Sequence, residues 1–129
     1  MNDRDPPTQK RQSVPSVMFI GVATEFVDRC RTALAPMPVI RAAHAVAAAE
    51  RAVVTRPVLI VLGPDQAERD MAHLADVARA VGAEIVQQAD LGDLERAPAK
   101  VEQLAATCAR RRSGQFVAVE LNEIKSRSR

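Results

Sequence analysis

Short apolar runs alternate with amphipathic stretches along the 129-residue chain. Runs typical of buried strands cover residues 17–22, 39–42, 58–62 and 83–88, and a stretch with helical spacing follows each of them. The third run is aliphatic throughout and lies between Pro57 and Gly63-Pro64, as expected of a central strand buried on both faces. Strand and helix therefore alternate four times, which predicts a three-layer α/β fold around a mainly parallel open sheet.

The spacing of apolar residues also predicts which side of each helix faces the sheet. Thr24 is expected to cap the first helix, and Asp65 with Glu68 to form a capping box for the third. Pro98 indicates the start of the last helix, which is expected to end near Arg112. The inward residues are predicted to be Phe26, Val27, Cys30 and Leu34 in the first helix, Val46, Ala49, Ala52 and Val53 in the second, Met71, Leu74, Ala75, Ala78 and Val81 in the third, and Val101, Leu104, Ala105 and Cys108 in the last.

Polar ends flank this pattern. Residues 1–16 contain three prolines and no apolar periodicity, which predicts a disordered tail. Residues 17–112 form the predicted domain, and residues 113–129 form a second tail that holds an apolar run over 116–121. That run is expected either to add a strand to this protein's own sheet or to dock on another chain.

Composition narrows the class of protein. Two cysteines, no secretory signal and no apolar run of about 20 residues predict a cytoplasmic protein with reduced thiols and no membrane span. Residues 17–108 hold nine Lys or Arg against twelve Asp or Glu, so the bases gather in the two ends. Nucleic-acid binding through these basic ends is a further alternative, and the near absence of aromatic residues counts against it.

Motifs for catalysis and cofactor binding are missing from the sequence. There is no glycine-rich phosphate loop and no nucleophile elbow, and His44 and His73 have no partner at metal-ligand spacing. We therefore expect no enzyme activity, no catalytic residue, no cofactor and no metal site, and we expect Cys30 and Cys108 to be buried, inert thiols. An alternative is a small α/β domain that binds a nucleotide or phosphate at residues 63–66 and 87–93, because a helix is expected to begin just after Gly63-Pro64.

The order of elements and the residues at the strand ends resemble the receiver domain of two-component response regulators, over about residues 17–112. In receivers the third strand is followed by the aspartate that accepts a phosphoryl group, and Gly63 takes that place here. Val22 and its neighbours stand where receivers have the acidic pair that holds Mg²⁺, and Gln88 stands where they have Thr or Ser. The family's fifth strand has no clear counterpart, so the resemblance implies a flavodoxin-like, receiver-like fold with a degenerate or missing fifth strand.

This resemblance implies a pseudo-receiver that aspartyl phosphorylation does not switch, since the transfer needs a carboxylate and a bound cation. Such a domain is expected to act through a surface. The predicted role is a non-enzymatic protein–protein interaction module in bacterial signalling or in localisation of a partner, with a homodimer as one form of the complex. The candidate partner-binding residues lie on the last helix and the tail and are Arg110, Arg111, Arg112, Phe116, Val119 and Leu121.

Overall fold

The computed structural model describes residues 14–64, 66 and 68–127, with Glu68 and residues 114–127 described through their backbone only. Four strands pair in parallel in one sheet, in the order β2-β1-β3-β4. Their bounds are β1 (Val17–Ile20), β2 (Val39–Ala42), β3 (Leu59–Leu62) and β4 (Glu84–Gln87). The predicted α/β fold with a parallel open sheet is confirmed, and no fifth strand is present within the described ranges.

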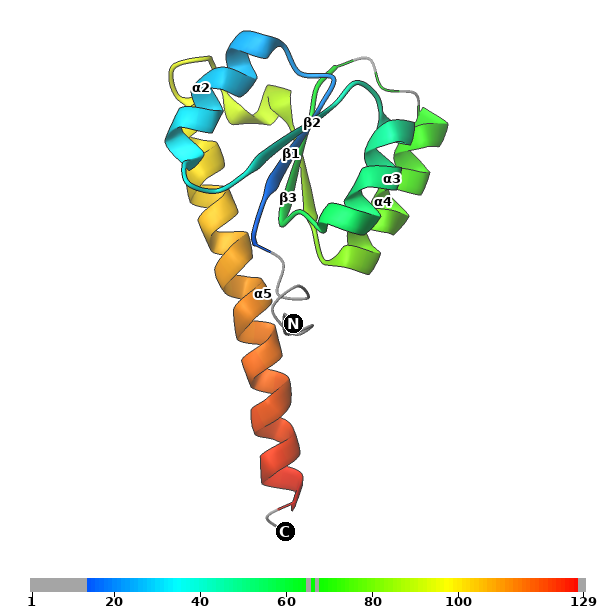
Figure 1. The fold of residues 1–129 in the computed structure, drawn as a ribbon, viewed down its shortest axis with the longest axis vertical. Helices are drawn as coiled ribbons and strands as arrows, with labels where there is room; N and C mark the ends of the chain where they lie inside the picture. The colour runs from blue at the N-terminus through cyan, green and yellow to red at the C-terminus, as the bar shows by residue number, and fades with distance from the viewer. Residues whose placement is uncertain (1–13, 65, 67, 128–129) are drawn as a thin grey trace, which may run out of the picture.

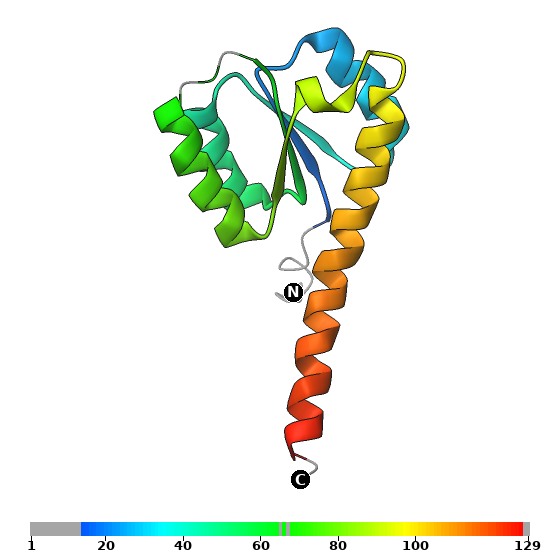
Figure 2. The ribbon, with the colours of Figure 1, turned by 180° about the vertical axis from the view of Figure 1, so that it is seen from behind.

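Helices cover both faces of the sheet. They are α2 (Thr24–Leu34), α3 (Ala45–Thr55), α4 (Glu68–Val81) and α5 (Ala97–Arg127), with a short 3-10 helix, η1 (Gln88–Leu91), after β4. Helices α2 and α5 pack on one face, and α3 and α4 lie side by side on the other (Figures 1 and 2). This arrangement gives the three layers that the alternation of strands and helices predicts.

Strand β3 supplies both halves of the core because successive side chains of a strand point to opposite faces. Leu59 and Val61 pack with residues of α2 and α5, whereas Ile60 and Leu62 pack with residues of α3 and α4. All four side chains are buried, as expected for a central strand of a parallel sheet.

Helix α3 faces the sheet with its alanines. The predicted inward residues Ala49 and Ala52 are buried, but Val46 and Val53 are exposed at 49% and 57%. Ala45 and Ala48 complete the buried side. Small side chains let α3 approach α4 and the sheet closely, so side-chain volume outweighed hydrophobicity in orienting this helix.

One of the predicted helix caps can be compared with the structure. Thr24 is the first residue of α2 rather than its cap, since Ala23 is the N-cap and makes no side-chain capping bond. His44 caps α3, where its Nδ1 atom accepts a hydrogen bond from the Ala47 N–H at 3.3 Å. The capping role predicted for Asp65 lies outside the described residues.

Helix α5 is far longer than predicted. It continues past Arg112 to Arg127, so residues 116–121 are helical, and the prediction that they add a strand to this protein's own sheet is wrong. Extending an existing helix adds one hydrogen bond for each residue fixed, whereas a new strand needs a new partner edge. Gly114 costs about 1 kcal/mol within a helix relative to alanine, which does not stop this extension.

We call residues 97–112 of α5 its inner half and residues 113–127 its outer half. The inner half packs on the domain, and the ribbon of the outer half runs away from the sheet and the other helices (Figures 1 and 2). Among the described residues, no helix combines the length and the apolar character needed to cross a membrane.

The amino-terminal tail predicted over residues 1–16 lies mostly outside the described residues. Its last residue belongs to the packed domain. Ser16 is buried, and its carbonyl oxygen accepts a hydrogen bond from the Val58 N–H at 2.9 Å.

Candidate functional site

The carboxyl end of the sheet is where the receiver resemblance places a phosphorylation site, and backbone atoms fill it here. Gly63 follows β3, and its N–H donates a hydrogen bond to the carbonyl oxygen of Ile20 at 2.8 Å. A Cβ atom at residue 63 would overlap the carbonyl oxygen of Gly21. No side chain can stand at position 63 unless the ends of β1 and β3 move apart.

A side chain, rather than backbone, crowds the position that directly follows β1. Gly21 has a φ of +62°, and a Cβ there would lie 2.6 Å from Nε2 of Gln66. Nε2 of Gln66 in turn donates a hydrogen bond to the carbonyl oxygen of Pro64 at 3.3 Å. Val22, the next residue, is buried in the core with α2 and α5, so this segment offers apolar contact where a receiver binds a cation.

A hollow of about 250 Å³ lies beside this closed end. Gln88, the third residue that the resemblance singles out, lines it, and its Oε1 atom is buried with no hydrogen-bond partner among the described residues. None of the lining residues carries a positive charge, so the walls offer no ion pair to a phosphate. The lining residues are Leu62, Gly63, Pro64, Gln87, Gln88, Ala89 and Gly92.

The amino end of the sheet is held by one side chain, Arg112, from the end of the inner half of α5. Its guanidinium donates hydrogen bonds to four backbone carbonyl oxygens, those of Arg56, Pro57, Val81 and Gly82, at 2.8 to 3.2 Å. These residues end α3 and α4 and lead into β3 and β4. Carbonyl groups at helix carboxyl ends carry partial negative charge, so a guanidinium is well suited to this place.

Burial lowers the pKa of Arg112, and the nearby positive charge of Arg56 adds to this effect. The guanidinium stays charged at neutral pH because the ordinary pKa of arginine lies far above neutrality. We call this set of four hydrogen bonds the Arg112 clamp.

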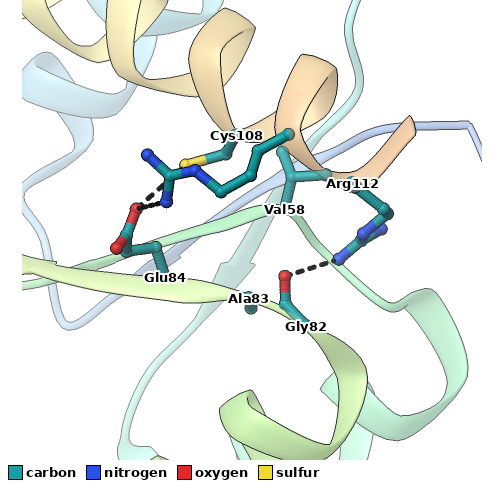
Figure 3. A pocket seen from close by; sticks show the side chains of 7 residues that line it. Val58, Gly82, Ala83, Glu84, Cys108 and Arg112 are labelled. Carbon is teal, nitrogen blue, oxygen red and sulfur yellow. Dashed lines mark hydrogen bonds and ion pairs between the residues drawn. The ribbon is translucent and has the colours of Figure 1, made fainter. Parts of the chain in front are cut away.

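A second polar group lies beside the clamp (Figure 3). Oε1 of Glu84 accepts hydrogen bonds from Nη1 of Arg111 at 3.1 Å and from Sγ of Cys108 at 3.4 Å. The Arg111 and Glu84 side chains are 55% and 50% exposed, so water screens their attraction. Together with the clamp they border a hollow of about 180 Å³.

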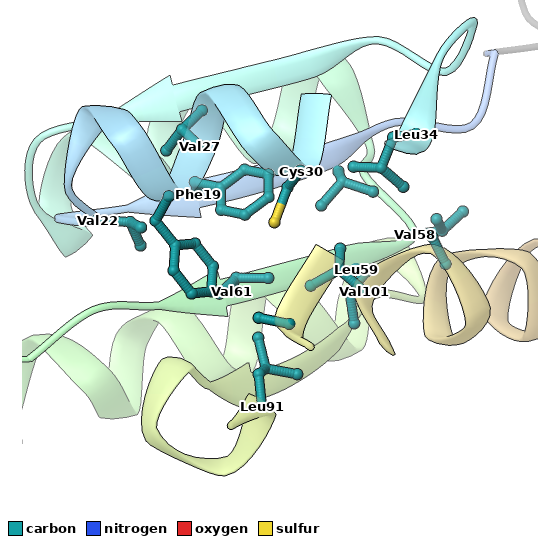
Figure 4. Packing of buried hydrophobic residues seen from close by; sticks show 14 of the residues in the cluster. Phe19, Val22, Val27, Cys30, Leu34, Val58, Leu59, Val61, Leu91 and Val101 are labelled. Carbon is teal, nitrogen blue, oxygen red and sulfur yellow. The ribbon is translucent and has the colours of Figure 1, made fainter. Parts of the chain in front are cut away.

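Both cysteines are free thiols in the core between α2 and α5. Figure 4 shows Cys30 pointing from α2 into the apolar cluster around Phe19 and Leu59. Burial raises the pKa of the Cys30 thiol from 9.0 to about 11. Burial also raises the pKa of Cys108 to about 11, and the hydrogen bond to Glu84 adds to this effect. Both thiols are therefore protonated and poorly nucleophilic at neutral pH, which agrees with their predicted inert role.

The candidate partner-binding residues fall into three environments. Arg110 is exposed, and its Nη2 atom donates a hydrogen bond to Oγ1 of Thr107 at 3.4 Å. Arg111 is exposed and pairs with Glu84, whereas Arg112 forms the clamp and binds backbone groups of the domain. The apolar candidates lie in the outer half of α5, where the backbone alone is described, and are Phe116, Val119 and Leu121.

The predictions from the sequence missed two features of these ends. The contact between Gly21 and Gly63 has a signal in the sequence, because a glycine directly follows each of two neighbouring parallel strands. The Arg112 clamp has none, since its acceptors are backbone atoms that lie 30 to 56 residues away in the chain. An arginine at the end of a predicted helix is more simply explained by the helix dipole.

Within the described parts of the chain, no group of three or more His, Cys, Asp or Glu residues could hold a metal ion. No protein-family model, curated protein or solved structure matches this chain.

Proposed function

We propose that this protein is a non-enzymatic pseudo-receiver that acts as a protein–protein interaction module, in bacterial signalling or in localisation of a partner. The outer half of α5 is its interaction element. The observation that carries this proposal is the continuation of α5 for fifteen residues, 113–127, beyond the Arg112 clamp.

An isolated helix of about 15 residues is only marginally stable in water, and most helical stability in proteins comes from packing of an apolar side. The ribbon of the outer half runs away from the domain that could provide such packing (Figure 1). The sequence of this half includes Phe116, Val117, Val119, Leu121 and Ile124. A partner that covers these residues would stabilise both the helix and the complex.

The closed carboxyl end supports the other part of the proposal, the absence of switching by aspartyl phosphorylation. Gly63 has no space for a carboxylate. We expect treatment with acetyl phosphate and Mg²⁺ to leave the intact mass of the full chain unchanged. A phosphate adduct on an aspartate would show that another carboxylate has taken over the role.

The interaction surface can be tested by chemical cross-linking of the tagged full chain in a cell extract. We expect cross-links from the outer half of α5 to another polypeptide, which can be a second copy of this chain. Replacing Phe116, Val119 and Leu121 together with glutamine, a good helix former, should abolish these cross-links. Circular dichroism should show that the variant keeps its fold.

A matched control is available on α3, where Val46, Val53 and Val54 are 49%, 57% and 79% exposed. Replacing these three valines with glutamine removes the same number of apolar side chains from a different surface. We expect this variant to keep every cross-link. The proposal is wrong if the α3 variant loses the association and the α5 variant retains it.

The alternative function, binding of a nucleotide or phosphate, has one observation in its favour, the hollow of about 250 Å³ beside Gly63. A ligand bound there would raise the melting temperature, because binding stabilises the folded state by mass action. A thermal shift with ATP, GTP or inorganic phosphate at millimolar concentration would support this alternative. We expect no shift, since the lining lacks positive charge.

A further inference from the structure

The apolar side of α5 changes at the Arg112 clamp. In the inner half the side that packs on the domain carries Ala97, Val101, Ala105 and Cys108. At about 100° per residue, the nine residues from Cys108 to Val117 make about two and a half turns, which places these two positions on opposite sides of the helix.

Val117, Leu121 and Ile124 are separated by four and then three residues. This spacing places the three positions on one side of a helix, as in the seam of a coiled coil. We call them the outer stripe. Because α5 is continuous, the three positions of the outer stripe lie on the side of the helix opposite to the side that packs on the domain in the inner half.

We propose that the outer stripe pairs with the same stripe of a second copy, in a parallel two-stranded coiled coil. This inference rests on the proposed function and names its partner. Glu120 and Lys125 flank the stripe and are five residues apart, the separation at which opposite charges attract across a parallel pair of identical helices. The two-fold axis then gives two such pairs.

An antiparallel pair of these helices is less favourable because like charges would repel each other. Centred on Leu121, it would bring the two Glu120 residues next to each other, with like charges at close range. The parallel arrangement also leaves room for the domains, since each domain packs on the side of its α5 opposite the seam.

Arg110 sets the end of the paired region that lies nearest the domains. It is exposed, and it lies seven residues before Val117 and therefore on the same side of the helix. Two facing Arg110 residues would repel each other, so the paired part covers the outer half alone, about 22 Å at 1.5 Å per residue. Two heptads give a weak, concentration-dependent dimer, and we expect a dissociation constant on the order of micromolar.

Two valines provide a matched pair of variants for analytical ultracentrifugation of the full chain. Val117 belongs to the outer stripe, whereas Val119 lies seven residues after Arg112, on the side that faces the domain in the inner half. We expect Val117→Gln to raise the dimer dissociation constant at least about tenfold and Val119→Gln to change it less than about twofold. Equal effects of the two variants would overturn the proposed seam.

Orientation can be tested with single cysteines introduced into the full chain, because Cys30 and Cys108 are buried and protonated. In a parallel pair, Val117→Cys alone forms a disulfide-linked dimer under mild oxidation, and so does Ile124→Cys alone. In an antiparallel pair, disulfide forms only when the two variants are mixed. The second result would overturn the parallel arrangement.

These experiments also distinguish a failure of this inference from a failure of the proposed function on which it rests. A purified chain that stays monomeric at several hundred micromolar, yet still cross-links through its outer half to a different protein, overturns the second copy as partner and leaves the proposed function standing. A monomeric chain whose outer half cross-links to nothing overturns both.

Discussion

The two ends of the parallel sheet are closed by different means. At the carboxyl end, the backbone atoms of Gly21 and Gly63 meet so closely that no side chain fits between them. At the amino end, the long side chain of Arg112 spans four backbone carbonyl groups. Ligands of open α/β sheets commonly bind at the carboxyl end, and there the glycine contact excludes a side chain at position 63. The amino end becomes the point from which the outer half of α5 leaves the domain.

This comparison predicts the largest loss of stability for Gly63→Ala. The new Cβ would contact a carbonyl oxygen of the neighbouring strand, and backbone cannot move aside as a flexible side chain can. We expect the free energy of unfolding to fall by about 3 kcal/mol or more in urea denaturation followed by circular dichroism.

Gly82→Ala is the matched control at the other end. Gly82 has a φ of +77°, but a Cβ there would have its nearest neighbour, in the Arg112 side chain, at 3.8 Å. Only the left-handed backbone is then strained, at a cost of about 1 kcal/mol. Equal losses for the two glycine variants would contradict the difference between the ends.

Removing the Arg112 clamp should have the next largest effect. Arg112→Gln leaves carbonyl groups at the ends of α3 and α4 without their donor, and we expect a loss of about 2 to 3 kcal/mol. Arg110→Gln, two residues earlier on the exposed side of α5, should change stability by less than about 0.5 kcal/mol. If both variants behave alike in thermal and urea denaturation, the clamp does not hold the amino end.

The buried thiols predict a loss of stability at alkaline pH. Burial raises the pKa of Cys30 from 9.0 to about 11, so the folded protein retains a proton that the unfolded chain releases. The stabilisation from this thiol is complete below pH 9 and is lost as the pH rises toward 11. When the pH is raised from about 8 to about 10, the free energy of unfolding should fall by about 1 kcal/mol less in the Cys30→Ala variant than in the original protein. Identical losses over this range would contradict the burial of the thiol in the folded state.

The smallest predicted effect concerns the exposed pair at the amino end. Glu84→Gln removes the ion pair with Arg111, and we expect less than about 0.5 kcal/mol of change in stability. Because Glu84 also raises the pKa of Cys108, the variant thiol should react somewhat faster with an alkylating reagent at alkaline pH. An unchanged alkylation rate would show that burial alone controls this thiol.

The sequence predicts the sheet and most helix faces well. The uninterrupted aliphatic residues of β3 and the spacing of Phe26, Val27, Cys30 and Leu34 in α2 are local patterns, and the structure buries all of them. The orientation of α3 depends instead on how closely two helices can approach, which a count of apolar residues does not report. The length of α5 was missed because Ser113-Gly114 is typical of a boundary, while the cost of a glycine within an established helix is small.

The candidate site was harder to predict because its contacts join distant parts of the chain. The strand-end glycines were interpreted as an absent phosphorylation site, although a glycine after each of two neighbouring strands also indicates that the two backbones approach closely. The four acceptors of Arg112 are carbonyl groups, which every residue has, so no residue type marks them.

The continuity of α5 through Arg112 has a mechanical consequence. With no break between its halves, the helix acts as a lever whose fulcrum lies at the clamp. Its free arm of fifteen residues is about 22 Å long, so a tilt of about 10° at the fulcrum moves the tip by about 4 Å. The carbonyl groups at the fulcrum belong to the ends of α3 and α4. We therefore expect a force on this arm to reach the opposite layer of the domain through the clamp, and a shift of that layer to redirect the arm.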